Sequence, residues 1–386
     1  MSTAIKENLI TIREQVARFA EQNIACRDDL HTMDGFPFDI WHKMGQERLL
    51  GLNLPETYGG LGGDYLSTVV AGETLVQRGH NMGLALSWLV HLIVSRFLIM
   101  GFGNKSQHDE YLRDLASGRI TASLAASEKG AGAHPKHLKT SGNRQDDLFV
   151  LNGEKTYLTN GPIADLFIVL AITGVDAGRN RFTSFIVPKE TEGLSITRQI
   201  DFGFLRPSPH CEIKLNDCSV HVSNILGKEG FAYEDMIRPF REIEETCLMG
   251  PIVGGMERQI ELLVSLIRKQ GVNPTDELKS ELGELKSLLD TLRIMAYEAG
   301  GMVDSDTNHT EFVSLLLSFR KLSGHFQSLF KAIMSKSKVE EDSDLVLITN
   351  DLVNTISIAK YVAQIKQRKL GEALLSERDS YEINPQ

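Results

Sequence analysis

Two short segments combine small residues with hydroxyl or aromatic side chains, a composition that suits contact with a ligand. In Ala126-Ser-Glu-Lys-Gly-Ala-Gly132, small residues let a backbone approach a ligand closely, and Ser127 offers a hydroxyl. In Lys155-Thr-Tyr-Leu-Thr-Asn-Gly161, Tyr157 and Thr159 share one strand face because side chains alternate. An aromatic plane beside a hydroxyl suits a flat heterocycle. Taken alone, the first segment is more often an ordinary loop and the second is more often an ordinary cross-strand face.

A third segment, residues 241–246, brings three carboxylates together at the start of an expected helix: Glu242, Glu244 and Glu245. Side chains so close in sequence include some that face water. An acidic first helical turn is an alternative explanation, because carboxylates stabilise the positive end of a helix. Composition alone favours the solvated turn over a catalytic carboxylate.

Charge and composition argue against several classes of protein. The chain has 386 residues, 42% of them hydrophobic, a net charge of −10 and no block of Lys and Arg, so we expect no nucleic-acid partner. No apolar run approaches the roughly 20 residues of a membrane helix, and the N-terminus lacks the apolar core of a signal peptide, so we expect no membrane insertion. The four cysteines lack CxxC spacing, and His134 and His137 lack a third ligand. We expect free thiols, a cytoplasmic protein and no metal.

The period of the apolar residues divides the chain into three segments that position these candidates. Residues 1–122 show spacing of three and four, which predicts helices, with one long helical stretch from Leu66 past Leu98. The glycine cluster at residues 55–63 is a turn between helices. Residues 123–229 change to a period of two and form a β domain, and residues 230–386 are helical again. This order predicts an α+β multidomain fold.

Turn-forming residues mark the strands of the predicted β domain. Asn152-Gly153 favours positive φ angles and predicts a hairpin over residues 149–158, and Asn216-Asp217 predicts a second turn. Residues 167–172 and 182–187 are apolar strands.

The clearest C-terminal helix begins near Thr275, whose hydroxyl can cap it. Its apolar stripe has the width of a bundle helix facing a core: Leu278, Leu282, Leu285, Leu289 and Leu292. This stripe and the run at residues 313–317 also supply candidate surface for contacts between subunits. We expect a homotetramer, or at least a dimer.

Taken together and in this order, the segments resemble the acyl-CoA dehydrogenase family. Residues 55–63 are similar to its P-E-x-x-G-G-x-G turn, residues 126–134 to its T-E-P-x-A-G-S-D loop, and residues 152–161 to its N-G-x-K-x-W-I-T-N-G strand. The likeness covers about residues 10–260 well and the C-terminal helices in outline. It implies an N-terminal α domain (1–122), a middle β domain (123–229) and a C-terminal four-helix bundle (230–386). It also implies FAD, homotetramers and α,β-dehydrogenation of an acyl thioester.

The resemblance also implies roles for individual residues. Four residues are expected to contact the isoalloxazine ring of FAD: Leu124, Ser127, Tyr157 and Thr159. Gly132 and Ala133 are expected near the FAD diphosphate and the pantetheine arm of the thioester. An electron-transferring flavoprotein is the expected electron acceptor.

A carboxylate base that removes the α-proton is part of the same resemblance, while the β-hydrogen leaves as hydride to flavin N5. One family branch places the base ten residues before a helix glycine, and counting back from Gly254 gives Glu244. Glu242 and Glu245 remain alternatives because loop lengths vary before this helix. Glu382 is a further alternative, in a terminal Tyr-Glu that echoes the family's Y-E-G-T loop.

The chain departs from the family pattern at several positions. Ala133 and His134 stand where the loop has serine and aspartate, Tyr157 stands where the strand has tryptophan, and the R-x-x-F-G segment is reduced to Arg268-Lys-Gln-Gly271. These departures motivate one alternative, a non-catalytic or FAD-deficient subunit of a mixed oligomer. A further alternative is a flavin monooxygenase or oxidase on the same fold. The sequence does not identify the acyl group of the substrate. A CoA thioester and a carrier-protein thioester both stay open, because both present the same pantetheine arm.

Overall fold

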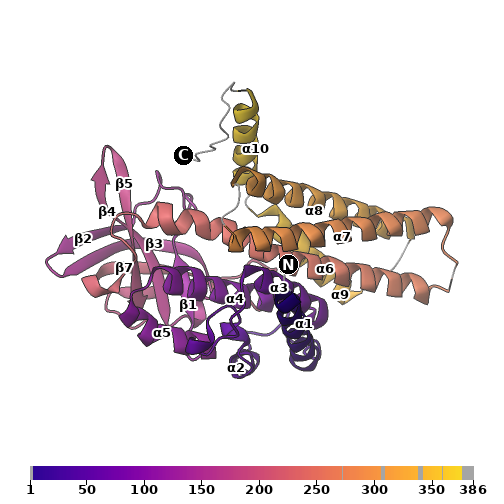
Figure 1. The fold of residues 1–386 in the computed structure, drawn as a ribbon, viewed down its shortest axis with the longest axis horizontal. Helices are drawn as coiled ribbons and strands as arrows, with labels where there is room; N and C mark the ends of the chain where they lie inside the picture. Colours follow the sequence, from indigo (N-terminus) through magenta and orange to yellow (C-terminus); the bar gives the residue numbers. More distant parts are fainter. Residues whose placement is uncertain (1–2, 272, 306–308, 338–341, 359, 376–386) are drawn as a thin grey trace. The chain divides into compact units, whose positions relative to one another are not determined.

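The computed structural model describes residues 3–271, 273–305, 309–337, 342–358 and 360–375. Glu382, one of the alternative bases, lies outside these residues. Helices α1 to α5 precede strands β1 to β8, and helices α6 to α10 follow, which confirms the predicted order of helical, β and helical segments (Figure 1). Domain boundaries at residues 122 and 229 stay a prediction.

By its internal contacts the chain forms two compact units, each assembled from separate stretches of sequence. The first contains Met1–Cys26, Asp64–Met82 and Glu245–Gln386, and the second contains Arg27–Gly63 and Gly83–Glu244.

Long helices build the first unit: α1 (Thr3–Asn23), α3 (Tyr65–Gly79), most of α6 (Arg238–Lys269), α7 (Asp276–Asp304), α8 (His309–Ser337), α9 (Ser343–Ser357) and α10 (Lys360–Leu375). Helices α7 and α8 run side by side (Figure 1). As predicted, Thr275 caps α7, its Oγ1 accepting a hydrogen bond from Leu278 N at 3.2 Å. Helix α6 approaches α3 closely, because a Cβ at Gly250 or Gly254 would lie 2.1 or 2.2 Å from an α3 carbonyl oxygen.

The second unit holds an eight-stranded sheet and the helices α2 (Phe38–Gln46), α4 (Met82–Ile93, from Gly83 on) and α5 (Lys105–Ser117). The strands are β1 (Ala122–Ala125), β2 (Ser141–Gln145), β3 (Leu148–Thr159), β4 (Leu166–Asp176), β5 (Arg179–Pro188), β6 (Leu194–Ile200), β7 (His210–His221) and β8 (Ile225–Leu226). Their order is β6-β7-β3-β2-β4-β5-β8, with β1 paired in parallel to β4. Strands β4 and β5 confirm the two predicted apolar strands.

The two predicted turns in the β domain are wrong. Asn152-Gly153 lies within the continuous strand β3, and Asn216-Asp217 lies within β7. The residues face each other at a β-bulge, where Asp217 N donates to Asn152 Oδ1 at 2.9 Å and Asn152 Nδ2 donates to Asp217 Oδ1 at 3.1 Å. Residues that tolerate a positive φ, such as Asp217 with φ 50°, serve a bulge as well as a turn.

The predicted helix from Leu66 past Leu98 is divided in two. It breaks at His80, which has a left-handed φ of 63°, and α4 continues as a π-helical segment, Val94–Met100. The statement that no apolar run is long enough to span a membrane is wrong, because Met82–Met100 has 19 residues and a mean hydropathy of 1.8. Within the fold 83% of an 18-residue window of that segment is buried, as in the core helices of soluble proteins.

Candidate active site

A cavity of about 150 Å³ lies within the second compact unit. Its walls come from α4, β1, the loop after β1, β3, the π-helical segment Tyr233–Ile237 and the start of α6: Val90, Leu124, Ala126, Ser127, Ala133, Thr156, Tyr157, Thr159, Ile237, Phe240, Arg241 and Glu244. Most of the residues predicted to form the site therefore line one cavity, although they come from three separate parts of the sequence. Gly132 is the exception, one residue before the wall residue Ala133.

The structure separates the three candidate carboxylates of α6. Glu244 lines this cavity, one helical turn after Arg241. Glu245 points elsewhere, into the first compact unit, where it pairs with Arg320 at 3.2 Å and Lys366 at 3.5 Å. Glu242 lines neither of the two cavities described here. The geometry thus favours Glu244 over its neighbours as the group facing a ligand, and its catalytic role stays a prediction.

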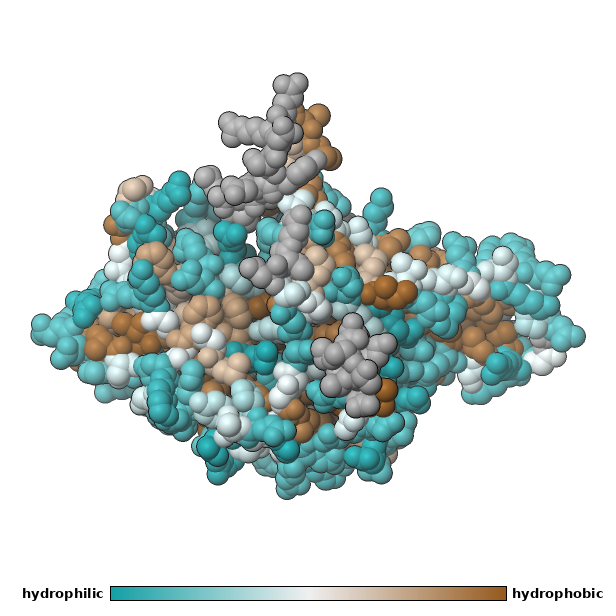
Figure 2. All heavy atoms as spheres, viewed as in Figure 1, coloured by the Kyte–Doolittle hydropathy of each residue, from teal (hydrophilic) through white to brown (hydrophobic). Residues whose placement is uncertain are grey.

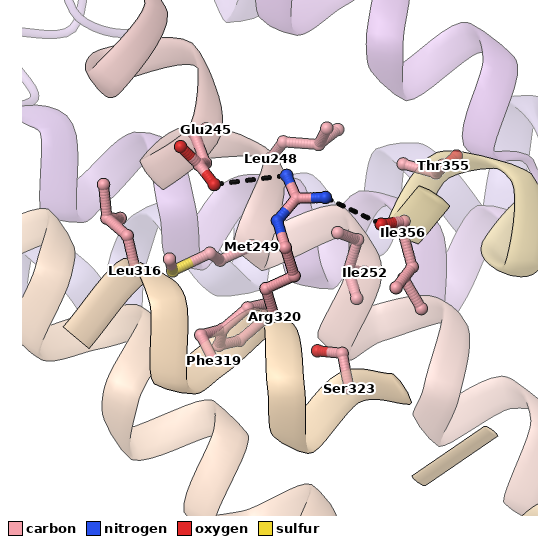
Figure 3. Close-up of a pocket in the computed structure, with 10 residues that line it drawn as sticks. All are labelled: Glu245, Leu248, Met249, Ile252, Leu316, Phe319, Arg320, Ser323, Thr355 and Ile356. Carbon is pink, nitrogen blue, oxygen red and sulfur yellow. Dashed lines mark hydrogen bonds and ion pairs between the residues drawn. The ribbon is translucent and has the colours of Figure 1, made fainter. Parts of the chain in front are cut away.

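Glu245 lines the second of these cavities, which is formed by α6, α8 and α9 (Figure 3). Arg320 occupies its centre and donates both to Glu245 Oε1 and to the carbonyl oxygen of Ile356, the latter at 2.9 Å. The space measures about 40 Å³, which leaves room for a few water molecules and not for a substrate. Glu245 is therefore a structural ion-pair partner of Arg320.

A buried ion pair holds the loop after β1 against β3. Lys155 Nζ lies 3.0 Å from Glu128 Oε1 and donates to the carbonyl of Ala126 at 3.2 Å. Glu128 also accepts hydrogen bonds from the backbone N–H groups of Lys139 and Thr140, at 2.8 and 2.9 Å. Burial lowers the pKa of Lys155 to about 8, against the opposing pull of Glu128. The pair fixes both ends of the loop that carries Ser127 and Ala133.

Tyr157 enters the cavity because of a second bulge in β3. Thr156 and Tyr157 together face Glu212 of β7, and Tyr157 has a left-handed φ of 62°. Tyr157 is 52% exposed, and its ring centroid lies 6.1 Å from that of Phe202. Tyr157 and Thr159 flank the core residue Leu158, so both lie on the side away from the core, as alternation predicted. The exposed ring is available to stack on a ligand.

His210 is a residue of this site that the sequence did not reveal. Its Nδ1 lies 3.1 Å from the carbonyl oxygen of Ser208, so Nδ1 carries the proton and Nε2 is the acceptor. The Thr159 hydroxyl therefore donates a hydrogen bond to His210 Nε2, at 3.1 Å. Burial lowers the pKa of His210 to about 4, which keeps it neutral. The Thr159 oxygen is left to accept hydrogen bonds from a ligand.

Gly132 and its neighbours form a tight turn rather than a wall. Glu128 N donates to the Gly132 carbonyl at 2.7 Å, and Gly132 N donates back to Glu128 O at 2.9 Å. Gly132 has a φ of 56°, a conformation that favours glycine. The turn directs Ala133 into the cavity, and its predicted role near a diphosphate stays a prediction.

Comparison with known proteins agrees with this architecture. The chain matches the family models described as acyl-CoA dehydrogenase N-terminal domain, over residues 6–119, and middle domain, over residues 123–218. It is 31% identical over 307 residues to the mitochondrial isovaleryl-CoA dehydrogenase of Solanum tuberosum, covering 78% of this chain and 74% of that relative.

Two further proteins act on carrier-bound groups, according to their names. The chain is 31% identical over 286 residues to the L-prolyl-(peptidyl-carrier protein) dehydrogenase of Pseudomonas fluorescens, covering 72% of this chain and 74% of that relative. The solved structure of the prolyl acyl carrier protein oxidase AnaB superposes with a TM-score of 0.81 and 26% identity, covering 97% of this chain and 99% of that chain. The two matched domains and the 31% identity to the isovaleryl-CoA dehydrogenase show that the chain belongs to the acyl-CoA dehydrogenase family.

Proposed function

We propose that Glu244 is the base of an FAD-dependent α,β-dehydrogenation of an acyl thioester. The chain is an acyl-CoA dehydrogenase-like oxidoreductase, and FAD is its cofactor. One observation supports the assignment of the base: Glu244 lines the same cavity as Ser127, Tyr157 and Thr159, the residues that the family resemblance assigns to the cofactor.

The polar groups of the cavity fit a flat heterocycle with polar edges. The hydroxyls of Ser127 and Thr159 lie on its walls, and the half-exposed ring of Tyr157 offers a stacking surface. These residues, with Leu124 and Ala133, would hold the flavin. When bound, FAD supplies the acceptor for the hydride that leaves the β-carbon of the substrate.

Glu244 would take the α-proton, which is weakly acidic and needs a base aligned with its carbon. The carboxylate shares the cavity with four apolar side chains that limit its contact with water: Val90, Leu124, Ile237 and Phe240. A water-poor site strengthens a carboxylate as a base, because burial disfavours its charged form.

The substrate is an acyl thioester, and we propose that a carrier protein or CoA presents it through a pantetheine arm. The names of the two relatives that act on carrier-bound prolyl groups support the first source, and that of the isovaleryl-CoA dehydrogenase supports the second. An electron-transferring flavoprotein is the proposed acceptor. The name of the carrier protein oxidase favours one second candidate, an oxidase that passes electrons to oxygen.

The proposed homotetramer needs apolar surface beyond the core. Most of the predicted stripe and run is used inside the chain instead: Leu285, Leu289, Leu292, Val313, Leu316 and Leu317 are buried. Leu278, Leu282 and Leu315 are partly buried. Other apolar side chains of the first unit are exposed on α7, α9 and α10: Ile294, Val346, Val353, Val362, Leu374 and Leu375. On the face drawn in Figure 2, apolar residues gather in patches among hydrophilic ones. Light scattering at the monomer mass of 42.9 kDa would contradict an oligomer.

The proposed cytoplasmic location is supported by four free cysteines, as expected in a reducing compartment.

The absorbance spectrum of the purified protein tests the proposed function. We expect a flavin spectrum that a thioester bleaches without oxygen, with one member of a panel of acyl-CoA and acyl-carrier thioesters most effective. Rapid reoxidation by air would support the oxidase, whereas slow reoxidation would support an acceptor protein. A parent protein that never bleaches with any thioester contradicts the dehydrogenase.

A further inference from the structure

A buried histidine ring that does not line the cavity holds the hydroxyl of a residue that does. Thr159 is a wall residue at the end of β3, and His210 is a buried residue at the start of β7. The two lie directly opposite each other in the β3–β7 ladder, and their side chains meet at 3.1 Å between Thr159 Oγ1 and His210 Nε2. The link from His210 to a ligand in the cavity therefore runs through Thr159.

Hydrogen bonds on both sides fix the segment that orients the ring of His210. Ser87 Oγ, from α4, donates to Ser208 Oγ at 3.0 Å, and Asn160 N donates to the carbonyl oxygen of Pro209 at 2.8 Å. The Ser208 carbonyl is thus held where it accepts the Nδ1–H of the ring, at 3.1 Å. Burial lowers the pKa of His210 to about 4, so the ring carries this one proton at pH 7. Nε2 keeps its lone pair for Thr159.

The hydroxyl of Thr159 has a single proton, which is used in its hydrogen bond to His210. Among the residues that the structure describes, no second group bonds to Thr159 Oγ1. The hydroxyl therefore offers only its lone pairs to the cavity. Without the ring, the same hydroxyl could turn and donate into the cavity as readily as accept. His210 thus makes Thr159 an acceptor.

We propose that His210 is a positioning residue that makes Thr159 favour the reduced form of the flavin. The inference rests on the proposed function, in which FAD occupies this cavity. The edge of an oxidised isoalloxazine consists mainly of acceptor atoms, which gain nothing from facing another acceptor. When the ring takes up a hydride, one acceptor nitrogen becomes an N–H donor. Thr159 Oγ1 accepts a hydrogen bond from that group, so FAD is easier to reduce than beside a hydroxyl that is free to donate.

The two-electron midpoint potential of the FAD-loaded protein tests this role. A chemical reductant with a reference dye replaces the thioester, so the measurement needs no turnover. His210→Phe keeps a ring and removes the acceptor, Thr159→Val keeps the shape and removes the hydroxyl, and the double variant completes the cycle. His91→Phe is the matched control. His91 is also buried with a pKa lowered to about 4, and its Nε2 contacts the carbonyl oxygen of Leu115, away from the cavity wall.

We expect His210→Phe to shift the balance about tenfold towards oxidised FAD, the worth of one good hydrogen bond. For a two-electron couple, tenfold is a potential about 30 mV lower. Thr159→Val should lower the potential similarly, and adding His210→Phe to it should change nothing more. His91→Phe should match the parent.

An unchanged potential in His210→Phe or in Thr159→Val overturns the inference, as does a His210→Phe shift that persists without the hydroxyl or appears equally in His91→Phe. If His210→Phe loses FAD, Thr159→Val decides, together with nitrogen NMR of the imidazole in the flavin-free parent. The Nδ1–H tautomer is expected there, and the Nε2–H tautomer overturns the inference. Failure of the proposed function shows separately, as an FAD-loaded parent with a measurable potential that no thioester reduces.

Discussion

Lys155 and Glu128 form an ion pair whose lysine side chain is entirely buried and whose carboxylate side chain is 9% exposed. We expect Lys155→Met to lower the free energy of unfolding by about 3 kcal/mol, because Glu128 would keep a buried charge without its cation. Urea denaturation measures the loss. The double variant Lys155→Met/Glu128→Gln should recover part of it, and a single variant as stable as the parent would show that the pair does not stabilise the fold.

Glu244→Gln tests the proposed base. The amide keeps the size of the side chain and cannot accept the α-proton, so substrate reduction of the flavin should slow by about 10²–10⁴-fold. Stopped-flow bleaching with the best thioester measures the rate, with FAD content as the check on folding.

Glu242→Gln and Glu245→Gln are the matched controls for the base. Glu245 pairs with Arg320, so its variant should change stability slightly and the bleaching rate little. If bleaching survives in Glu244→Gln and disappears in one of the controls, the base is that neighbour. If all three variants bleach like the parent, the base lies elsewhere, with Glu382 the remaining candidate.

Tyr157→Ala tests the stacking surface. Removing the ring should weaken FAD retention about 3–10-fold, the usual worth of an aromatic pair. The melting temperature should stay close to the parent value, since Tyr157 is 52% exposed and carries little of the core. Tyr157→Phe keeps the ring and should retain FAD like the parent. Equal FAD occupancy in the parent and in Tyr157→Ala would remove this residue from the site.

Stability should fall as the pH drops from 7 to 5. Burial lowers the pKa of His91 and of His210 to about 4, below the usual value for an unfolded chain. Between these values the unfolded state binds more protons, so acid favours unfolding, by about 2 kcal/mol for each histidine at pH 5. Urea titrations at several pH values measure the slope, and His210→Asn should make it about half as steep. An unchanged slope would show that His210 titrates normally in the folded state.

Sequence patterns predicted the elements whose signals are local. Apolar spacing identified the helices on both sides of the β domain, and Thr275 marked the start of α7 because capping depends on nearby residues. The order of the motifs predicted a shared site for Ser127, Tyr157, Thr159 and Glu244, and all four line one cavity.

Features that depend on a partner strand or helix were out of reach. The dipeptide Asn152-Gly153 is compatible with a hairpin turn and with a β-bulge. The partner strand β7 decides between them, and the local sequence does not show that strand. Nothing near His210 in sequence indicates that its ring meets Thr159, 51 residues away. The apolar segment Met82–Met100, by contrast, could have been found from the sequence by averaging hydropathy over a window of 18 residues.

The two bulges between β3 and β7 cancel each other. The first adds a residue to β7 opposite Asn152, and the second adds one to β3 at Tyr157, so the pairing offset is the same before the first and after the second. Deleting one extra residue alone would slip the rest of the ladder by one position and turn core side chains outward. Deleting one from each strand together would preserve the register. Tyr157 and Asp217 could therefore be removed together while the remaining strand pairs stay unchanged, although removal of either one alone would shift the register between the two bulges.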